Sequence, residues 1–126
     1  MKIKLTGNWC NDEELYNRFN RVYINTLNAD PDITFTPGNN FDLLVIINRP
    51  WSYQYKEFPK EKTLGVIMEP TWSSNICGFH SILGQLCSYI LHHKPYDSAQ
   101  YIYYPGLLPP HIDYDSGNNL DYYINT

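Results

Sequence analysis

The sequence predicts an α/β domain with a mainly parallel sheet and helices on both of its faces. Its apolar segments are short and unbroken, which is typical of strands that are covered on both sides. These segments alternate with stretches of helical periodicity, which favours parallel strands joined by crossover connections. Residues 43–47 and 63–68 form the two most apolar segments, and we expect both in the interior of the sheet.

Length and composition exclude several classes of protein. The 126 residues suffice for one domain with its own core but are few for a complete two-domain enzyme. The net charge of -4, without any basic run, argues against a nucleic-acid-binding protein. No apolar run approaches the roughly 20 residues of a membrane span, and the N-terminus lacks the apolar region of a signal peptide. Cys10, Cys77 and Cys87 have neither redox-pair nor zinc-knuckle spacing, so we expect free thiols in a cytoplasmic protein.

The first half of the chain predicts three strands and one helix. Residues 3–5 form a short strand, and Asn11 then caps a helix in a capping box with Glu14. A brief alternating strand is expected at residues 33–36, and the buried segment 43–47 follows it. One face of the helix should pack on the sheet, and it is formed by residues that recur at helical spacing: Leu15, Phe19, Val22, Tyr23 and Thr26.

The second half predicts a similar alternation. Residues 51–61 are rich in aromatic residues and proline without a period, and indicate a crossover loop or a single irregular turn. After the buried segment 63–68, Ser73 or Ser74 caps a helix that runs to about Gln85 and carries apolar residues at Ile76, Phe79, Leu83 and Leu86. Two last strands are expected at residues 88–92 and 101–104, and the domain should end at Gly106.

Polar and aromatic residues follow the two most apolar strands. Glu69 comes directly after one of them, whereas Asn48 and Trp51 follow the other, and Trp72 lies three residues beyond Glu69. Ligands of open α/β sheets collect outside the carboxyl ends of the strands, so these groups converge if the strands are neighbours. A carboxylate in this position is also often a helix cap or a solvated loop residue, and spacing alone leaves that reading open.

The sequence gives no support for a metal ion or a bound nucleotide cofactor. His92 and His93 are adjacent, so on a strand they should point to opposite sides, and His80 and His111 have no ligand spacing to them. The glycine-rich and serine motifs of dinucleotide-binding, P-loop and serine-hydrolase proteins are missing.

Several motifs together resemble glycosyltransferase family 10, the α-1,3/4-fucosyltransferases. Met68-Glu69-Pro70 stands where the family has an apolar strand that ends in a glutamate. The strand and basic turn of residues 88–98, followed by Tyr104-Pro105-Gly106, are similar to the family in order and spacing. Asn8-Trp9-Cys10 and residues 42–48 resemble the opening of shorter, non-animal members.

The resemblance implies a Rossmann-like acceptor-side domain at residues 1–106, which is one half of a GT-B-type glycosyltransferase. It implies that Glu69 is the general base of an inverting transfer from GDP-fucose, or a similar nucleotide sugar, to a hydroxyl of a glycan acceptor. Other expected substrate-binding residues are Asn48, Trp72, Trp51 and Trp9. The donor-binding half would follow Gly106, so residues 107–126 are expected to be a linker or tail towards a domain on the same or another chain.

We expect little or no transfer by this chain alone, which would be a fragment, a split enzyme or a degenerate copy. One alternative is a non-catalytic flavodoxin-like module that binds a ligand or a partner chain at the same edge of the sheet. Another is a structural protein that dimerises through an exposed apolar wall.

Overall fold

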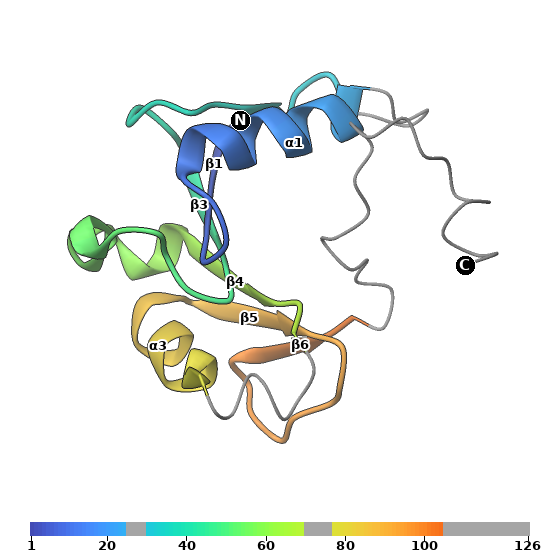
Figure 1. The fold of residues 1–126 in the computed structure, drawn as a ribbon. Helices are drawn as coiled ribbons and strands as arrows, with labels where there is room; N and C mark the ends of the chain where they lie inside the picture. Colours follow the sequence, from blue (N-terminus) through green and yellow to red (C-terminus); the bar gives the residue numbers. More distant parts are fainter. Residues whose placement is uncertain (25–29, 70–76, 105–126) are drawn as a thin grey trace, which may run out of the picture.

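The computed structural model describes residues 1–24, 30–69 and 77–104, which form a six-stranded sheet with every neighbouring pair of strands parallel. The strands lie in the order β2-β1-β3-β4-β5-β6 (Figure 1). Their bounds are β1 Lys2–Gly7, β2 Thr34–Phe35, β3 Leu43–Ile47, β4 Thr63–Ile67, β5 Tyr89–His92 and β6 Tyr101–Tyr103. The predicted parallel α/β sheet is therefore confirmed, with β3 and β4 side by side in its interior.

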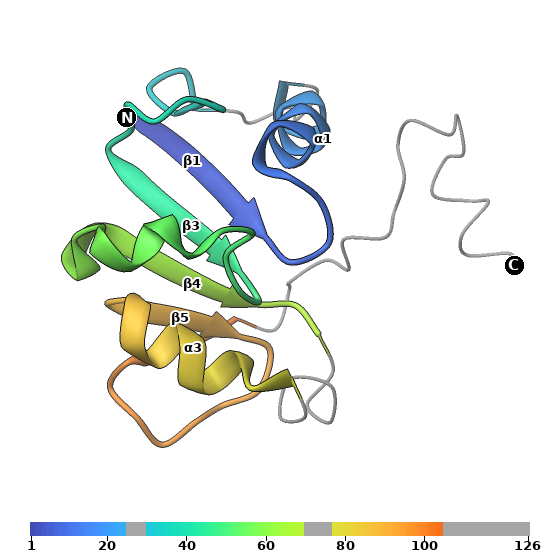
Figure 2. The same cartoon turned by 60° about the vertical axis from the view of Figure 1, so that its left-hand side comes forward.

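Within the described residues, α1 (Asp12–Ile24) and α3 (Phe79–Leu86) connect strands on opposite sides of the sheet. The helix α1 leads from β1 to β2, and α3 leads from β4 to β5. These two crossovers run in opposite directions along the sheet, so right-handed connections place their helices on opposite faces. Figure 2 shows α3 in front of β5, with α1 at the other end of the sheet, beside β1. We call the two sides the α1 face and the α3 face.

The connection between β3 and β4 differs from its prediction. Instead of a loop or a single irregular turn, it contains two short 3-10 helices, η1 (Tyr53–Glu57) and η2 (Lys60–Lys62). Ser52 caps the start of η1, since its side chain accepts a hydrogen bond from the Gln54 N–H. Tyr55 of η1 is buried in the core on the α3 face, so this segment covers the sheet beside α3.

The start of α1 follows the sequence. The Asn11 side-chain oxygen accepts the Glu14 N–H at 2.9 Å, which confirms the cap. The capping box is incomplete, because the Glu14 carboxylate contacts Arg18 at 2.8 Å, one turn further along the helix, and not the Asn11 N–H. Leu15 is fully buried and Phe19 packs against the same cluster, as expected for the sheet-facing side. The remaining predicted positions, Val22, Tyr23 and Thr26, lie outside the described side chains.

The helix predicted up to about Gln85 is interrupted at Gly78, with Cys77 helical before it and α3 after it. Ser73, Ser74 and Ile76 lie outside the described residues, and α3 starts at Phe79, immediately after Gly78. Gly78 has φ of 70°, a left-handed conformation that glycine adopts without steric cost and that interrupts a helix. The predicted apolar face continues from there, with Phe79 and Leu83 buried and Leu86 packed beside them.

The alternation of side chains divides the core into one cluster on each face. On the α3 face the cluster consists of Leu44, Ile46, Tyr55, Ile67, Leu83, Cys87 and Ile90. On the α1 face it consists of Leu5, Cys10, Leu15, Ile47 and Val66. Within the part of the chain that the structure describes, no helix has the length and apolar character needed to cross a membrane.

Candidate functional site

The carboxyl ends of β1 and β3 border the point where the strand order reverses. From β1 the chain crosses to β2 on one side, whereas the later strands are added on the other side, starting with β3. In open α/β sheets this is the place where ligands bind. Residues 8–11 follow β1 and residues 48–52 follow β3, so these two loops and the end of β4 define the candidate site.

Asn48 joins the ends of three strands. Its side-chain nitrogen donates to the Asn8 side-chain oxygen at 3.0 Å, across the gap between β1 and β3. Its side-chain oxygen accepts the Met68 N–H at 3.0 Å, and its own N–H donates to the Val66 carbonyl at 2.8 Å. The backbone φ of Asn48 is 66°, a left-handed value that asparagine tolerates better than most residues.

Asn48 therefore has a structural role at the centre of the candidate site: its hydrogen bonds brace the ends of β1, β3 and β4 against one another. Its side chain is 0% exposed, and Asn8 and Met68 already occupy its two polar ends. A sugar hydroxyl could reach it only if one of these contacts opened. Its expected contact with substrate stays a prediction, whereas its bracing role follows directly from the hydrogen bonds.

Glu69 follows the braced residue Met68 and is partly buried at the end of β4. The Met68 N–H is held by Asn48, so the backbone leading into Glu69 is fixed to the end of β3. A carboxylate on a braced strand end is suited to accept a proton from a bound hydroxyl, because its position varies little. The next seven residues, 70–76, lie outside the described residues.

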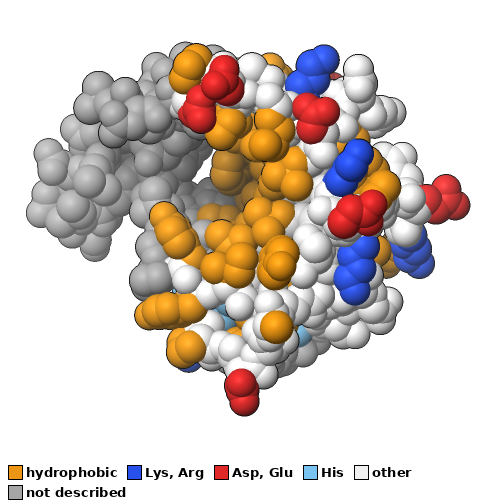
Figure 3. All heavy atoms as spheres, turned by 180° about the vertical axis from the view of Figure 1, so that it is seen from behind, with side chains coloured by type: hydrophobic (Ala, Val, Ile, Leu, Met, Phe, Trp, Pro, Cys, Tyr) orange, Lys and Arg blue, Asp and Glu red, His pale blue; other side chains and the backbone are white. Residues whose placement is uncertain are grey.

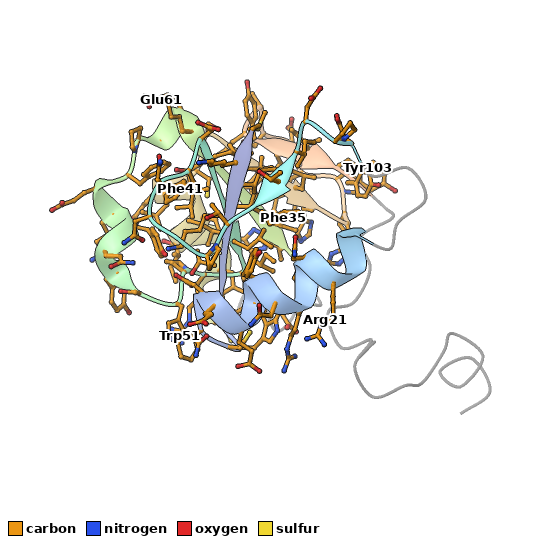
Figure 4. The ribbon with its side chains drawn as sticks, turned by 90° about the horizontal axis from the view of Figure 1, so that it is seen from above. Arg21, Phe35, Phe41, Trp51, Glu61 and Tyr103 are labelled. Atoms are coloured by element: carbon orange, nitrogen blue, oxygen red, sulfur yellow. The ribbon has the colours of Figure 1, made fainter. Side chains whose placement is uncertain are left out.

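The three tryptophans of the predicted site have different surroundings. Trp51 is 52% exposed, and its backbone N–H donates to the Thr6 hydroxyl at 2.9 Å. It lies at the end of the molecule where α1 begins, far along the helix from Arg21 (Figure 4). Trp9 is partly buried and packs against the core cluster on the α1 face. Trp72 is among the residues that are not described.

A buried polar network fixes the Trp51 loop. The Thr6 hydroxyl donates to one carboxylate oxygen of Asp12 at 2.7 Å, and the Tyr55 hydroxyl donates to the other. Burial raises the pKa of Tyr55, and the bond to Asp12 raises it further, so this hydroxyl stays protonated as a donor. The buried ammonium of Lys4 lies 3.8 Å from Asp12. Asp12 thus holds the loop at two points. It contacts Tyr55 directly, and it contacts Thr6, which in turn accepts the Trp51 N–H.

The role of Asp12 was not predicted, because an acidic residue in the first turn of a helix is already favoured by the helix dipole. The available signal was Thr6 directly after the predicted strand of residues 3–5, since a hydroxyl that the sheet buries requires a partner. The sequence does not reveal which carboxylate supplies it, because the strand and helix must first pack together.

A second cluster of polar rings lies on the α3 face beside β5 and β6. The His80 Nδ1 lies 2.6 Å from the Tyr101 hydroxyl, and the His80 Nε2 lies 3.3 Å from the Tyr96 hydroxyl. His92 is fully buried, with its Nδ1 within 3.1 Å of the Lys94 backbone N–H. Burial lowers the pKa of both histidines, and each also lies near a further imidazole that lowers it.

The histidines do not point as the sequence suggested. The rings of His92 and His93 have centroids 4.5 Å apart, so the expectation that they face opposite sides is wrong. The strand β5 ends at His92, and the alternation of side chains ends with it. Within the described ranges, no three His, Cys, Asp or Glu side chains come together in an arrangement that could hold a metal ion.

The candidate site thus combines a carboxylate on a fixed strand end, an exposed indole on a fixed loop, and an amide that joins the two. These groups could bind a hydroxyl-bearing ligand and accept its proton. Comparisons with models of known protein families, with curated proteins and with solved structures found no match. What is established is an α/β domain with an all-parallel six-stranded sheet.

Proposed function

We propose that this chain is the acceptor-binding half of an inverting glycosyltransferase of the fucosyltransferase type, with Glu69 as its general base. The observation that carries the proposal is the position of Glu69 at the carboxyl end of β4, directly after a backbone N–H that Asn48 holds. The similarity of Met68-Glu69-Pro70 and of residues 88–106 to glycosyltransferase family 10 supplies the reaction class. The parallel α/β fold is compatible with that class and does not by itself select it.

In this proposal Glu69 removes the proton of an acceptor hydroxyl as the hydroxyl oxygen attacks the anomeric carbon of the donor sugar. The bond between that carbon and the nucleotide diphosphate breaks, and the diphosphate leaves with the bonding electrons. The proton ends on the Glu69 carboxylate. A base contributes in this way only when it lies within hydrogen-bond reach of the hydroxyl. A fixed backbone before Glu69 helps to keep the carboxylate within that reach.

Trp51 is a candidate for contact with the acceptor because its side chain is exposed. An exposed indole presents a flat apolar surface, and the apolar face of a sugar ring can stack on it. The network of Thr6, Asp12 and Tyr55 limits the movement of the loop that carries it. Trp9 contributes part of its surface to the core, so its contact with a sugar would use the remainder. The contacts of Trp72 and Asn48 with the sugar are also part of the proposal.

The donor would bind outside the groups described above. A nucleotide sugar such as GDP-fucose carries a diphosphate, which basic side chains or helix N-termini bind. We propose that a donor-binding domain, on the same chain or another, supplies these groups. Transfer then requires both parts, and the described domain alone is expected to bind the glycan acceptor without turning it over.

The test is the substitution Glu69→Gln, assayed together with a donor-binding domain, with GDP-fucose and a set of glycan acceptors. Loss of the base should lower kcat by about 10²–10⁴-fold and leave the free energy of unfolding nearly unchanged. Glu61→Gln, at an exposed carboxylate of η2 on another part of the chain, is the matched control and should retain full activity. Near-normal turnover by the Glu69→Gln protein would exclude the proposed role. Failure of the wild-type protein both to bind glycans and to transfer sugar would exclude the proposed function.

The strand order favours a second candidate. The order β2-β1-β3-β4-β5 is that of flavodoxin-like sheets, in which ligands bind at the reversal between β1 and β3. A non-catalytic module would bind a ligand or partner chain there, through Trp51 and the loops joined by Asn8 and Asn48. In that case Trp51→Ala should abolish ligand binding, whereas Glu69→Gln should have no effect on it.

A further inference from the structure

The α1 face of the sheet is covered over β1 and is open over β5 and β6. The register pairs Val66 with Leu91, and Leu91 with Ile102, so these side chains lie in one row on the side of Val66 and Leu5. Tyr89 lies on the same side as Leu91, two residues away on β5. Tyr89 is 50% exposed and Ile102 is 43% exposed. Figure 3 shows hydrophobic side chains gathered in a band on this side of the molecule.

The opposite side of β5 is closed, whereas on the edge strand β6 Tyr103 is 55% exposed on that side too. Ile90 and His92 of β5 are both 0% exposed beneath α3 and the rings of Tyr96 and Tyr101. All-parallel sheets are almost always covered on both faces, because their strands are apolar on both. A contiguous apolar surface that is rimmed by polar residues commonly marks a contact with another segment or chain. The open surface formed by Leu64, Tyr89, Leu91 and Ile102 is therefore expected to have an occupant.

The chain itself continues from the border of this surface. β6 is the edge strand, and its last hydrogen bond to β5 joins the Tyr104 N–H to the His92 carbonyl at 2.9 Å. Residues 105–126 follow directly. They contain neither Lys nor Arg, and their apolar side chains are too many for a purely solvated tail: Leu107, Leu108, Ile112, Tyr114, Leu120, Tyr122, Tyr123 and Ile124.

The continuation is long enough to cover the surface. Neighbouring strands are about 4.8 Å apart, so the distance across the sheet from β6 to β4 is roughly 10 Å. An extended chain advances about 3.3 Å per residue, so about three residues cross that width. The remaining residues suffice to follow the strands, and this holds for an extended segment or for a helix, which advances about 1.5 Å per residue.

We propose that residues 107–124 of this chain dock on the open α1 face, over Leu64, Tyr89, Leu91 and Ile102. The segment would bury its own apolar side chains and those of β5 and β6 in one contact. This inference does not depend on the proposed function, because it rests on the sheet and on the composition of the segment. It also gives residues 107–126 a place on the domain before any connection to a donor-binding domain.

The test is photo-crosslinking of the full chain from defined positions. Tyr89 is replaced by p-azidophenylalanine, which has nearly the same shape and places the reactive group on the open face. The matched control carries the same residue at Tyr53 of η1, which is 73% exposed and distant from that face. Cleavage at aspartate then separates the segment, since Asp113, Asp115 and Asp121 divide it and it lacks tryptic sites.

Docking predicts that the probe at Tyr89 crosslinks to peptides from residues 107–124 within the monomer, with a yield that does not change on dilution. The probe at Tyr53 should give no such product. Replacing both Leu107 and Leu108 by Ser should lower the yield from Tyr89 several-fold. Crosslinked dimers whose yield falls on dilution would instead show that a second copy covers the face. Equal yields from both probes, or no product from Tyr89, would overturn the proposal.

Discussion

The two faces of the sheet are closed to different degrees, although the same strands form both. On the α3 face Leu44, Ile46, Ile67 and Ile90 are all 0% exposed, under α3 and the 3-10 segment. On the α1 face, burial is complete only near α1, and apolar side chains of β5 and β6 remain open. Unbroken apolar strands therefore predict a parallel sheet, but they do not show which of its faces the rest of the chain covers.

The faces also differ in the polar groups that they bury. The buried polar side chains of the strands, Lys4, Thr6, Thr63 and His92, all alternate to the α3 side. Most have a partner there, such as Asn39 for Lys4 at 2.9 Å and the Pro59 carbonyl for Thr63 at 2.9 Å. Such groups are tolerated only where partners surround them. The α3 face is thus held by apolar packing together with buried hydrogen bonds, whereas the α1 face is held by apolar contact.

The largest expected effect comes from truncating adjacent residues of β5 that point to opposite faces. Ile90→Ala should lower the free energy of unfolding by about 2–5 kcal/mol, because it opens a cavity in a closed core. Leu91→Ala should cost less, about 1–2 kcal/mol, because its surroundings are partly open. Urea unfolding of both variants measures the difference. Equal costs would contradict the comparison and would show that the α1 face is covered in solution.

Replacing one glycine on each face by alanine tests the same contrast, because each substitution adds one methyl group. A Cβ at Gly65, on the α3 face, would lie 3.0 Å from Cys87 Sγ and 3.2 Å from Leu83 Cδ1, and neither side chain has room to move. Gly65→Ala should therefore cost about 1–3 kcal/mol. Gly7→Ala, on the α1 face, places the Cβ 3.3 Å from the partly buried Trp9 ring and should cost less than about 1 kcal/mol. Thermal unfolding of the two proteins decides the order, and a larger loss at Gly7 would reverse it.

The smallest expected effect is a pH dependence that originates on the α3 face. Burial lowers the pKa of His80 and His92 in the folded state, whereas both titrate near 6.5 when unfolded. The unfolded chain then binds more protons below that value, so this contribution to stability is present above it and is lost as the pH falls towards the folded pKa values. Urea unfolding between about pH 7.5 and about pH 5.5 should show this decline.

The groups around the two rings set the sign of that effect. Burial lowers the pKa of His92 most; its bond to the Lys94 backbone offsets part of that shift, and the charges of His93 and Lys94 add to it. Around His80 lie His92 and the hydroxyls of Tyr96 and Tyr101, and none of these is a carboxylate. His92→Leu removes one titrating group and should flatten the decline. His93→Gln, at a neighbouring ring that is less buried, is the control and should leave most of it. An unchanged slope in the His92→Leu protein would assign the decline to other residues.

Much of the fold could be predicted from the sequence, and less of the candidate site. The strands, the capped start of α1 and the parallel pairing were predicted because each depends on local periodicity or on a short capping pattern. The interruption of the helix at Gly78 was missed because the left-handed conformation of that glycine does not follow from the residues beside it. Glu69, Asn48 and Trp51 were predicted as a group at strand ends, but the burial of Asn48 was not, since it depends on the contacts of two other strands.

The sequence by itself determined the class of the fold, because apolar runs and helical periods act over a few neighbouring residues. Only the tertiary structure decided how the strand ends are joined. The hydrogen bond from Asn48 to Asn8 and that from the Trp51 N–H to Thr6 connect residues separated by 40 and 45 positions. A pattern read along the chain does not specify such partners, because they meet only after the sheet has formed and its helices have taken their faces.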